Sequence, residues 1–175
     1  VWADSVLATT GDLDPGLRFR LGRPSTWSQG SGDLGRRMET ILTRGLTARP
    51  RAMVLGADLP GLPIQRLREA NRVLEDHDAV LGPTEDGGFF LIGLKRVEPG
   101  LLDNLPWSSE ETFDRTRARL ESAGYRVGLT EPWFDVDRPA DLQRIHRLLQ
   151  QERAIAPQTS AALRQFDPVK VRRAV

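Results

Sequence analysis

Apolar and polar positions follow two patterns along this chain. Short continuous apolar runs predict buried strands, because a strand covered on both faces has few polar residues. Longer runs have apolar residues at i, i+3, i+4 and i+7, the spacing of an amphipathic helix. We predict strands at residues 5–10, 51–58, 78–83, 88–94 and 125–130, and helices that begin near Leu34, Pro63, Ser109 and Pro139.

Two segments follow neither pattern. Residues 11–33 are polar and rich in glycine and proline, which predicts a loop. Residues 151–175 lose the periodicity, which predicts a C-terminal tail that can hold one more short helix. Strands that alternate with helices over residues 1–150 predict one α/β domain with a mostly parallel sheet. Ligands of such sheets bind beyond the carboxyl ends of the strands, so acids at those positions are the candidates for function.

Two local patterns make sharper predictions. Ser108 and Glu111 have the spacing of a capping box before a helix over residues 109–123, and Gly124 is placed to end that helix. The run "AMVL" at residues 52–55 is apolar throughout, which predicts a buried strand.

Composition excludes several kinds of site. None of the 175 residues is a cysteine, and two histidines argue against a zinc–histidine site, so any metal would be Mg²⁺ or Mn²⁺ held by carboxylates. The net charge of +1 argues against nucleic acid as a partner. No apolar run is long enough for membrane insertion. The first residues lack a basic, apolar leader, which predicts a cytoplasmic protein.

Asp58 directly follows the strand predicted at residues 51–58. It stands in the pattern Gly-x-Asp-x-Pro, in which Gly56 lets backbone or ligand approach closely and Pro60 turns the chain toward the next helix. The carboxylate is thereby predicted to face the cleft. The alternative is an aspartate that only caps the turn at Pro60.

A second acidic segment, "WFDVDRPADL", precedes the last predicted helix. The period of two places Asp135 and Asp137 on one side of an extended segment, where two carboxylates repel unless a cation or donors lie between them. Alternatively, Asp137 caps the helix. Both acidic segments follow apolar strands, so they could meet at one sheet edge and hold a divalent ion that bridges phosphates.

Two glycine-rich loops complete the candidates. In "QGSGDLGRRM" (29–38) glycines run into a helix, where backbone N–H groups can receive an anion; a flexible loop is the alternative. Arg37 could contact phosphate or lie on a solvated helix face, and Trp107 could stack on a base or pack at the rim of the core. In "GPTEDGG" (82–88), the glycines after Asp86 are predicted to let a ligand approach the backbone, and Glu85 is predicted to be solvated.

Five segments occur in a fixed order between about residues 5 and 150: "WSQGSGDLGRRM", "VLGADLP", "GPTEDGGFFLIGL", "LPWSSEETFDRTRARL" and "DVDRPADL". Together they resemble a bacterial family of GT-A-fold transferases of unassigned substrate, also described as radical-SAM/selenodomain-associated, glycosyltransferase-like transferases. They are more distantly similar to the guanylyltransferases of molybdenum cofactor and phospholactate metabolism. The resemblance implies a Rossmann-like GT-A domain, a three-layer sandwich that binds a nucleotide or nucleotide-sugar with Mg²⁺ or Mn²⁺.

The resemblance also implies roles for single residues. Asp58 would be the principal metal ligand and a catalytic residue, and Asp135 and Asp137 would supply the second metal ligand. Asp86 would be catalytic, either orienting an acceptor hydroxyl or acting as a base. The residues expected to contact the nucleotide or the substrate are Gln29, Gly30, Gly32, Asp33, Gly35, Arg37, Gly87, Gly88 and Trp107.

One family element has no counterpart here. Such families open with a strand and a Gly-x-x-Lys-Thr-Arg-like loop that grips the phosphates, whereas this sequence opens at what corresponds to the second strand. We expect the missing strand and loop to precede residue 1. If the protein had instead lost them, a non-catalytic nucleotide-binding domain would be the alternative function.

The predicted function is metal-dependent transfer from a nucleotide-activated substrate to a small-molecule acceptor. The family resemblance favours glycosyl transfer from a nucleotide-sugar. Nucleotidyl transfer with release of pyrophosphate is the alternative within the same fold. A homodimer is compatible with a transferase of this size.

Overall fold

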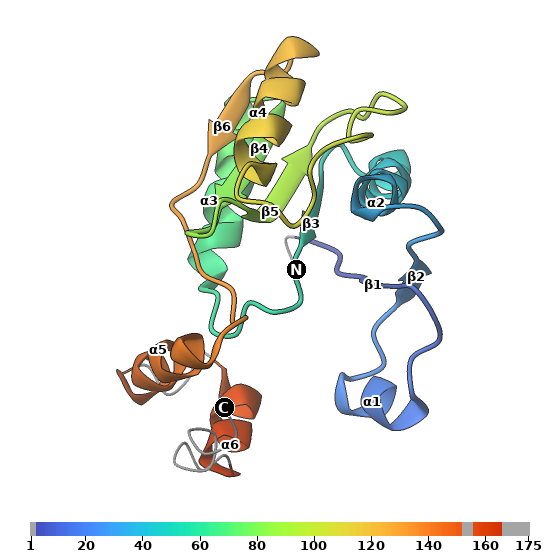
Figure 1. Ribbon diagram of the computed structural model, residues 1–175. Coiled ribbons are helices and arrows are strands. Elements are labelled where there is room, and N and C mark those ends of the chain that lie inside the picture. Colours follow the sequence, from blue (N-terminus) through green and yellow to red (C-terminus); the bar gives the residue numbers. More distant parts are fainter. Residues whose placement is uncertain (1–2, 152–155, 166–175) are drawn as a thin grey trace.

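A four-stranded sheet with the order β3–β5–β4–β6 forms the centre of the computed structural model, which describes residues 3–151 and 156–165. β3 and β4 each pair antiparallel with β5, and β6 pairs parallel with β4. Three strands therefore run in one direction and β5 runs against them (Figure 1). The strands are β3 (Ala52–Leu55), β4 (Ala79–Pro83), β5 (Phe89–Leu94) and β6 (Val127–Leu129).

The predicted α/β class is confirmed, but the mostly parallel pairing is not. The loop of residues 84–88 between β4 and β5 is too short for a crossover helix, so the chain returns as a hairpin and β5 is antiparallel. Because β3, β4 and β6 still run in one direction, their carboxyl ends lie at the same end of the sheet.

Helices cover both faces of this sheet and give the predicted three layers (Figure 1). Leu81 and Val80 are neighbours in β4 and point to opposite faces. Leu81 packs in one core with Leu42 of α2, and Val80 packs in another with Leu74 of α3. The helices of these layers are α2 (Leu34–Ala48), α3 (Ile64–Asp76) and α4 (Thr112–Ser122).

Residues 11–33 are more ordered than the predicted loop. They contain α1 (Pro15–Arg20) and β2 (Thr26–Ser28), which pairs parallel with β1 (Leu7–Thr9). The Asp14 side chain accepts a hydrogen bond from the Leu17 N–H at 2.8 Å and starts α1. Both elements are too short to show a hydrophobic period, which is why the sequence pattern did not reveal them.

The start of α4 also differs from the prediction. Glu111 occupies the N-cap position and makes no side-chain capping bond, and Ser108 lies in a left-handed conformation with φ of 58°. The Thr112 hydroxyl instead donates to the carbonyl oxygens of Pro106 and Ser109. The predicted capping box is therefore wrong, because the chain turns through Ser108 before the helix begins.

β3 lies at an edge of the sheet, although its apolar sequence predicted a buried strand. Its residues are half-buried, apart from Leu55, which is exposed at 41%. Within the described part of the chain, β3 pairs with β5 alone, so its other edge stays open to the cleft described below. No helix of the described ranges has the length and apolar character needed to cross a membrane.

α5 (Pro139–Gln151) and α6 (Pro157–Gln165) form a separate small core. Phe134, Ile145 and Leu149 are buried there, and Leu163 of α6 packs against them. α6 is the short helix expected in the tail. The rest of the tail, residues 152–155 and 166–175, lies outside the described residues.

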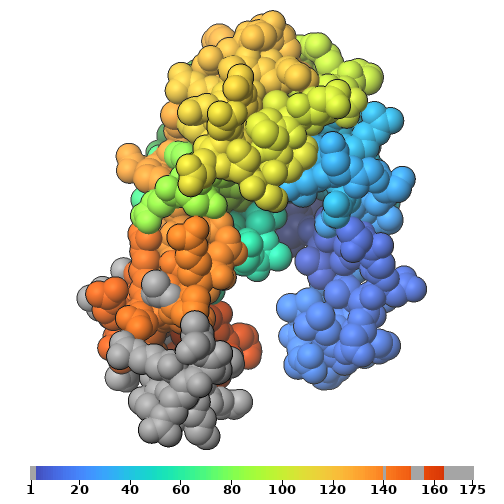
Figure 2. Space-filling model, viewed as in Figure 1, coloured from blue at the N-terminus to red at the C-terminus, as the bar shows by residue number. Residues whose placement is uncertain are grey.

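Two parts of the molecule extend from the sheet and leave an opening between them. Figure 2 shows the blue N-terminal part, with β1, β2 and α1, on one side of this opening and the orange α5 on the other.

Candidate metal and substrate site

A cleft of about 1130 Å³ lies at the carboxyl ends of β3 and β4. Its walls come from parts of the chain that are far apart in sequence, which meet where the two extensions join the sheet (Figure 2). The segments that contribute lining residues are 6–8, 29–41, 53–58, 84–90, 107–112 and 134–144.

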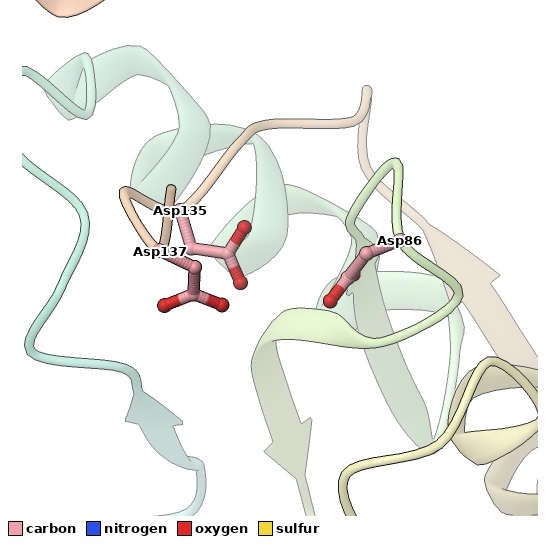
Figure 3. Close-up of side chains that lie close together, drawn as sticks. All are labelled: Asp86, Asp135 and Asp137. Carbon is pink, nitrogen blue, oxygen red and sulfur yellow. The ribbon is translucent and has the colours of Figure 1, made fainter. Parts of the chain in front are cut away.

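Three carboxylates converge in this cleft. Asp86, in the loop between β4 and β5, meets Asp135 and Asp137, in the segment before α5, and one ligand atom from each lies within 4.8 Å of the others. Figure 3 shows these side chains reaching one region from two loops. The sequence pattern that placed Asp135 and Asp137 on one side of an extended segment predicted this pair, and Asp86 completes the group.

Backbone hydrogen bonds bring the two loops together. The Trp133 N–H donates to the carbonyl oxygen of Pro83 at 3.1 Å, and Thr84 forms a parallel bridge with Trp133. On the other side, the Val136 N–H donates to the carbonyl oxygen of Asp58 at 3.2 Å. The Asp-Val-Asp segment thus lies between the loop after β4 and the Gly-x-Asp segment after β3. The prediction that the two acidic segments meet at one sheet edge is confirmed.

Asp58 lines the cleft but is not one of the three converging carboxylates. Its side chain is exposed, and a Cβ atom at Gly56 would lie 2.6 Å from the Asp58 Oδ1 atom. A side chain at position 56 would therefore displace the Asp58 carboxylate from the position it has here. The charge of Asp58 raises the pKa of Asp135, so Asp58 interacts electrostatically with the three converging carboxylates.

Asp86 is held in its ionised form. Its carboxylate accepts hydrogen bonds from the Thr84 hydroxyl and from the Gly88 N–H, the latter at 3.1 Å. The Thr84 bond is the main cause of a lowered pKa for Asp86, against a smaller opposing effect of burial. Asp86 is consequently a weaker proton acceptor than an ordinary aspartate and a better permanent anion.

Asp135 is perturbed in the opposite direction. Burial is the main cause of its raised pKa, and the charges of Asp86, Asp137 and Asp58 raise it further. A cation between carboxylates this close stabilises their ionised forms, because it offsets their mutual repulsion. The site therefore has the electrostatics of a cation site.

The alternative role of Asp137 as a cap of α5 stays a prediction, and the side chain seen to bind backbone N–H groups before this helix is that of Asp141. The backbone N–H groups of Asp137 and Arg138 both donate to the Asp141 Oδ2 atom, at 3.2 and 2.8 Å. Asp141, one turn into α5, thus satisfies the start of the helix. The Asp137 carboxylate remains with the other two acids (Figure 3).

The glycine-rich loop of residues 29–38 is only partly in the cleft. Gln29 and Arg37 line it, while the other four predicted contact residues of this loop do not. Asp33 caps α2 by accepting from the Arg36 N–H at 2.9 Å. A Cβ atom at Gly35 would lie 2.2 Å from the Leu102 carbonyl oxygen, so this glycine serves close packing. The residues outside the lining are Gly30, Gly32, Asp33 and Gly35.

The glycines of "GPTEDGG" serve the chain itself. Gly87 has φ of 88°, lies outside the cleft lining, and would place a Cβ atom 2.1 Å from the Glu110 carbonyl oxygen. Gly88 does line the cleft, but a Cβ there would first meet the Thr84 hydroxyl at 3.0 Å. At Gly87, close approach of backbone accounts for the glycine, whereas the predicted contact of Gly88 with a ligand stays a prediction.

Trp107 lines the cleft and packs at the rim of the core, and its predicted contact with a base stays a prediction. Its ring packs edge-on against Phe89, with 6.3 Å between ring centroids, and its buried indole Nε1 has no hydrogen-bond partner in the described part of the chain. A buried N–H usually has an acceptor. Trp107 can offer its ring to a ligand, whereas its indole N–H is buried.

Glu85 is exposed, as the sequence predicted, but its ion pair with Arg144 was not foreseen. Its two carboxylate oxygens accept from Arg144 Nη1 and Nη2 at 2.6 and 2.7 Å. The Arg144 guanidinium keeps the pKa of Glu85 below its usual value. The two residues are 59 positions apart, so no local spacing could have revealed the pair.

The three layers, the strand directions and the acidic cleft at the strand ends together define a GT-A-like domain. A family described as "Uncharacterized protein conserved in bacteria (DUF2064)" matches residues 2–109. The chain belongs to this family.

Among solved structures, the chain is similar to the "putative nucleotide-diphospho-sugar transferase" from Desulfovibrio desulfuricans G20. The two are 27% identical, with a TM-score of 0.82 over 94% of this chain and 74% of that chain. This similarity confirms the predicted GT-A-like fold. No curated protein matches the chain.

Proposed function

We propose that this protein is a metal-dependent transferase that moves a glycosyl group from a nucleotide-sugar to a small-molecule acceptor. The observation that carries the proposal is the convergence of Asp86, Asp135 and Asp137 in the cleft. The similarity to a nucleotide-diphospho-sugar transferase fold supports the substrate class. We further propose that the family's link to radical-SAM and selenodomain systems extends to this protein.

The donor set fits a hard divalent cation. Asp86, Asp135 and Asp137 offer carboxylate oxygens, which Mg²⁺ and Mn²⁺ prefer, and the described part of the chain brings no nitrogen or sulfur ligand into this group. Asp58 is placed to join them through a bound water or a shift of its exposed side chain. Such an ion, when bound, supplies positive charge that neutralises a diphosphate leaving group.

The chain's own residues have separate tasks in this proposal. The lowered pKa of Asp86 favours ligation and orientation of an acceptor hydroxyl over acceptance of its proton. Gln29 and Arg37 border the side of the cleft near β1, where a nucleotide could lie. Trp107 offers the face of its ring in the same cleft.

The test is a calorimetric titration of nucleotides and nucleotide-sugars into the full-length protein with Mn²⁺ and with a chelator. We expect binding that requires Mn²⁺ and falls at least about tenfold in Asp135→Asn, the loss typical of a ligand-shell change. Asp114→Asn is the matched control, because this exposed aspartate on α4 lies outside the cleft lining.

Two outcomes would change the proposal. Binding of nucleotide that is equal with chelator and in Asp135→Asn would remove the role of the metal. Product analysis separates the chemistries, because glycosyl transfer releases a nucleoside diphosphate and nucleotidyl transfer releases pyrophosphate. Nucleotide binding without either product would favour the non-catalytic alternative.

A further inference from the structure

Arg144 contacts both loops that supply the converging carboxylates. Its guanidinium forms a two-pronged ion pair with Glu85, the residue before Asp86. The same guanidinium lies over the ring of Phe134, the residue before Asp135, with 3.9 Å from Cζ to the ring centroid. One side chain of α5 thus joins the two loops immediately beside the acids; we call these three residues, Glu85, Phe134 and Arg144, the Arg144 bridge.

The acids themselves oppose this arrangement. Three carboxylates whose ligand atoms lie within 4.8 Å repel one another, and Asp135 is further disfavoured as an anion by burial. The hydrogen bonds of Asp86 with Thr84 and Gly88 lie within the loop between β4 and β5. They therefore cannot hold this loop against the segment that carries Asp135 and Asp137. In the described part of the chain, separation of the loops is opposed by the Trp133–Pro83 bond, the Thr84–Trp133 bridge, the attraction between Arg138 and Asp86, and the Arg144 bridge.

We propose that Arg144 is a positioning residue that holds Asp86 at binding distance from Asp135 and Asp137 through the Arg144 bridge. The proposal rests on the metal site of the proposed function. Two parallel hydrogen bonds fix the guanidinium in its plane, which a single ion pair cannot do. The plane also stacks on Phe134, so the loops are set in both distance and orientation.

Simple electrostatics predicts the opposite effect on cation binding, which makes the proposal testable. Arg144 lines the same cleft as the acids, so removing its charge makes the site more negative. A more negative site should bind a cation more tightly if position were unchanged. Weaker binding after loss of Arg144 would therefore report lost positioning.

The first experiment is a Mn²⁺ titration followed by electron paramagnetic resonance. We expect about tenfold weaker binding in Arg144→Gln, as for loss of an outer-shell partner. Arg144→Lys, which keeps the charge but not the two-pronged geometry, should be intermediate. The double exchange Glu85→Arg with Arg144→Glu keeps the net charge and the ion pair, and should recover most of the affinity.

Arg147→Gln is the matched control. Arg147 lies on the same helix, loses the same charge, and its Nε donates to the Gln143 carbonyl oxygen within that helix. It should bind Mn²⁺ like the unaltered protein or slightly more tightly. Equal or tighter binding in Arg144→Gln as well, or no recovery in the double exchange, would overturn the proposal.

A second measurement separates the Arg144 bridge from the metal site. In metal-free protein, hydrogen exchange of peptides that cover residues 83–89 and 133–137 should be faster in Arg144→Gln than in Arg147→Gln. Unchanged exchange in both peptides would overturn the positioning role. If the unaltered protein binds no Mn²⁺ at all, the metal site fails, and the exchange result still decides the role of Arg144.

Discussion

Asp135 is the residue at which the requirements of binding and of stability conflict. Its carboxyl is half-buried beside three other acids, and burial is the main cause of its raised pKa. A group whose pKa is higher in the folded than in the unfolded protein stabilises the fold when protonated. That stabilisation is lost as pH rises through the raised pKa.

We therefore expect Asp135→Asn to stabilise the metal-free protein at pH 7. The expected gain is about 0.5 kcal/mol, a value reduced for partial exposure to solvent. The gain should shrink as pH falls toward the ordinary aspartate value of 3.8, because Asp135 becomes protonated and resembles asparagine. Urea denaturation with a chelator, at pH 7 and pH 4.5, measures this difference.

Addition of Mn²⁺ should reverse the order of stability, because the ion binds the folded form of the unaltered protein more tightly than that of the variant. Asp114→Asn again serves as the control and should show neither effect. If Asp135→Asn were instead less stable than the unaltered protein at pH 7 without metal, the prediction would be wrong. Contacts within the folded protein would then stabilise the ionised Asp135 carboxylate.

At the scale of elements, the loop between β4 and β5 packs directly on the start of α4. The Phe113 N–H donates to the Gly87 carbonyl oxygen at 2.8 Å, and the backbone of Glu110 fills the space beside Gly87. This contact fixes the loop that carries Asp86. It also explains a glycine that sequence reasoning had assigned to a ligand.

Gly87→Ala should lower the free energy of unfolding by about 3 kcal/mol, because a clash with backbone adds to the strain of a left-handed residue. Gly124→Ala is matched to it, since Gly124 has φ of 76° and no atom within 4 Å of the added Cβ. That control should lose about 1 kcal/mol, the cost of the conformation alone. Urea denaturation compares the two variants. Equal losses in the free energy of unfolding would mean that the Glu110 backbone moves to accommodate the added Cβ atom with no loss of stability.

The sequence revealed elements that have a period and missed those that depend on short or distant contacts. Leu42 and Leu74 lie on the apolar faces that predicted α2 and α3. α1 was missed because its six residues span less than two turns, which is too short to show a helical period. Only the Asp14 cap marks its start. The direction of β5 was missed because an apolar run carries no information on pairing.

At the scale of the whole molecule, strand direction explains why part of the site was predictable. Segments that follow strands of one direction leave the sheet at the same end, which predicted that Asp58 lies near Asp135 and Asp137. The ion pair of Glu85 with Arg144 was not predictable, since it joins a hairpin loop to the face of a distant helix. Tertiary contacts of this kind leave no periodic trace in the sequence.

Asp86, Asp135 and Asp137 are proposed to hold one divalent cation. A crystal of the protein grown with Mn²⁺ and measured for anomalous scattering tests this site. We predict one anomalous peak about 2.1 Å from an oxygen of each of these carboxylates. The absence of a peak among them in crystals that hold Mn²⁺ elsewhere would contradict it.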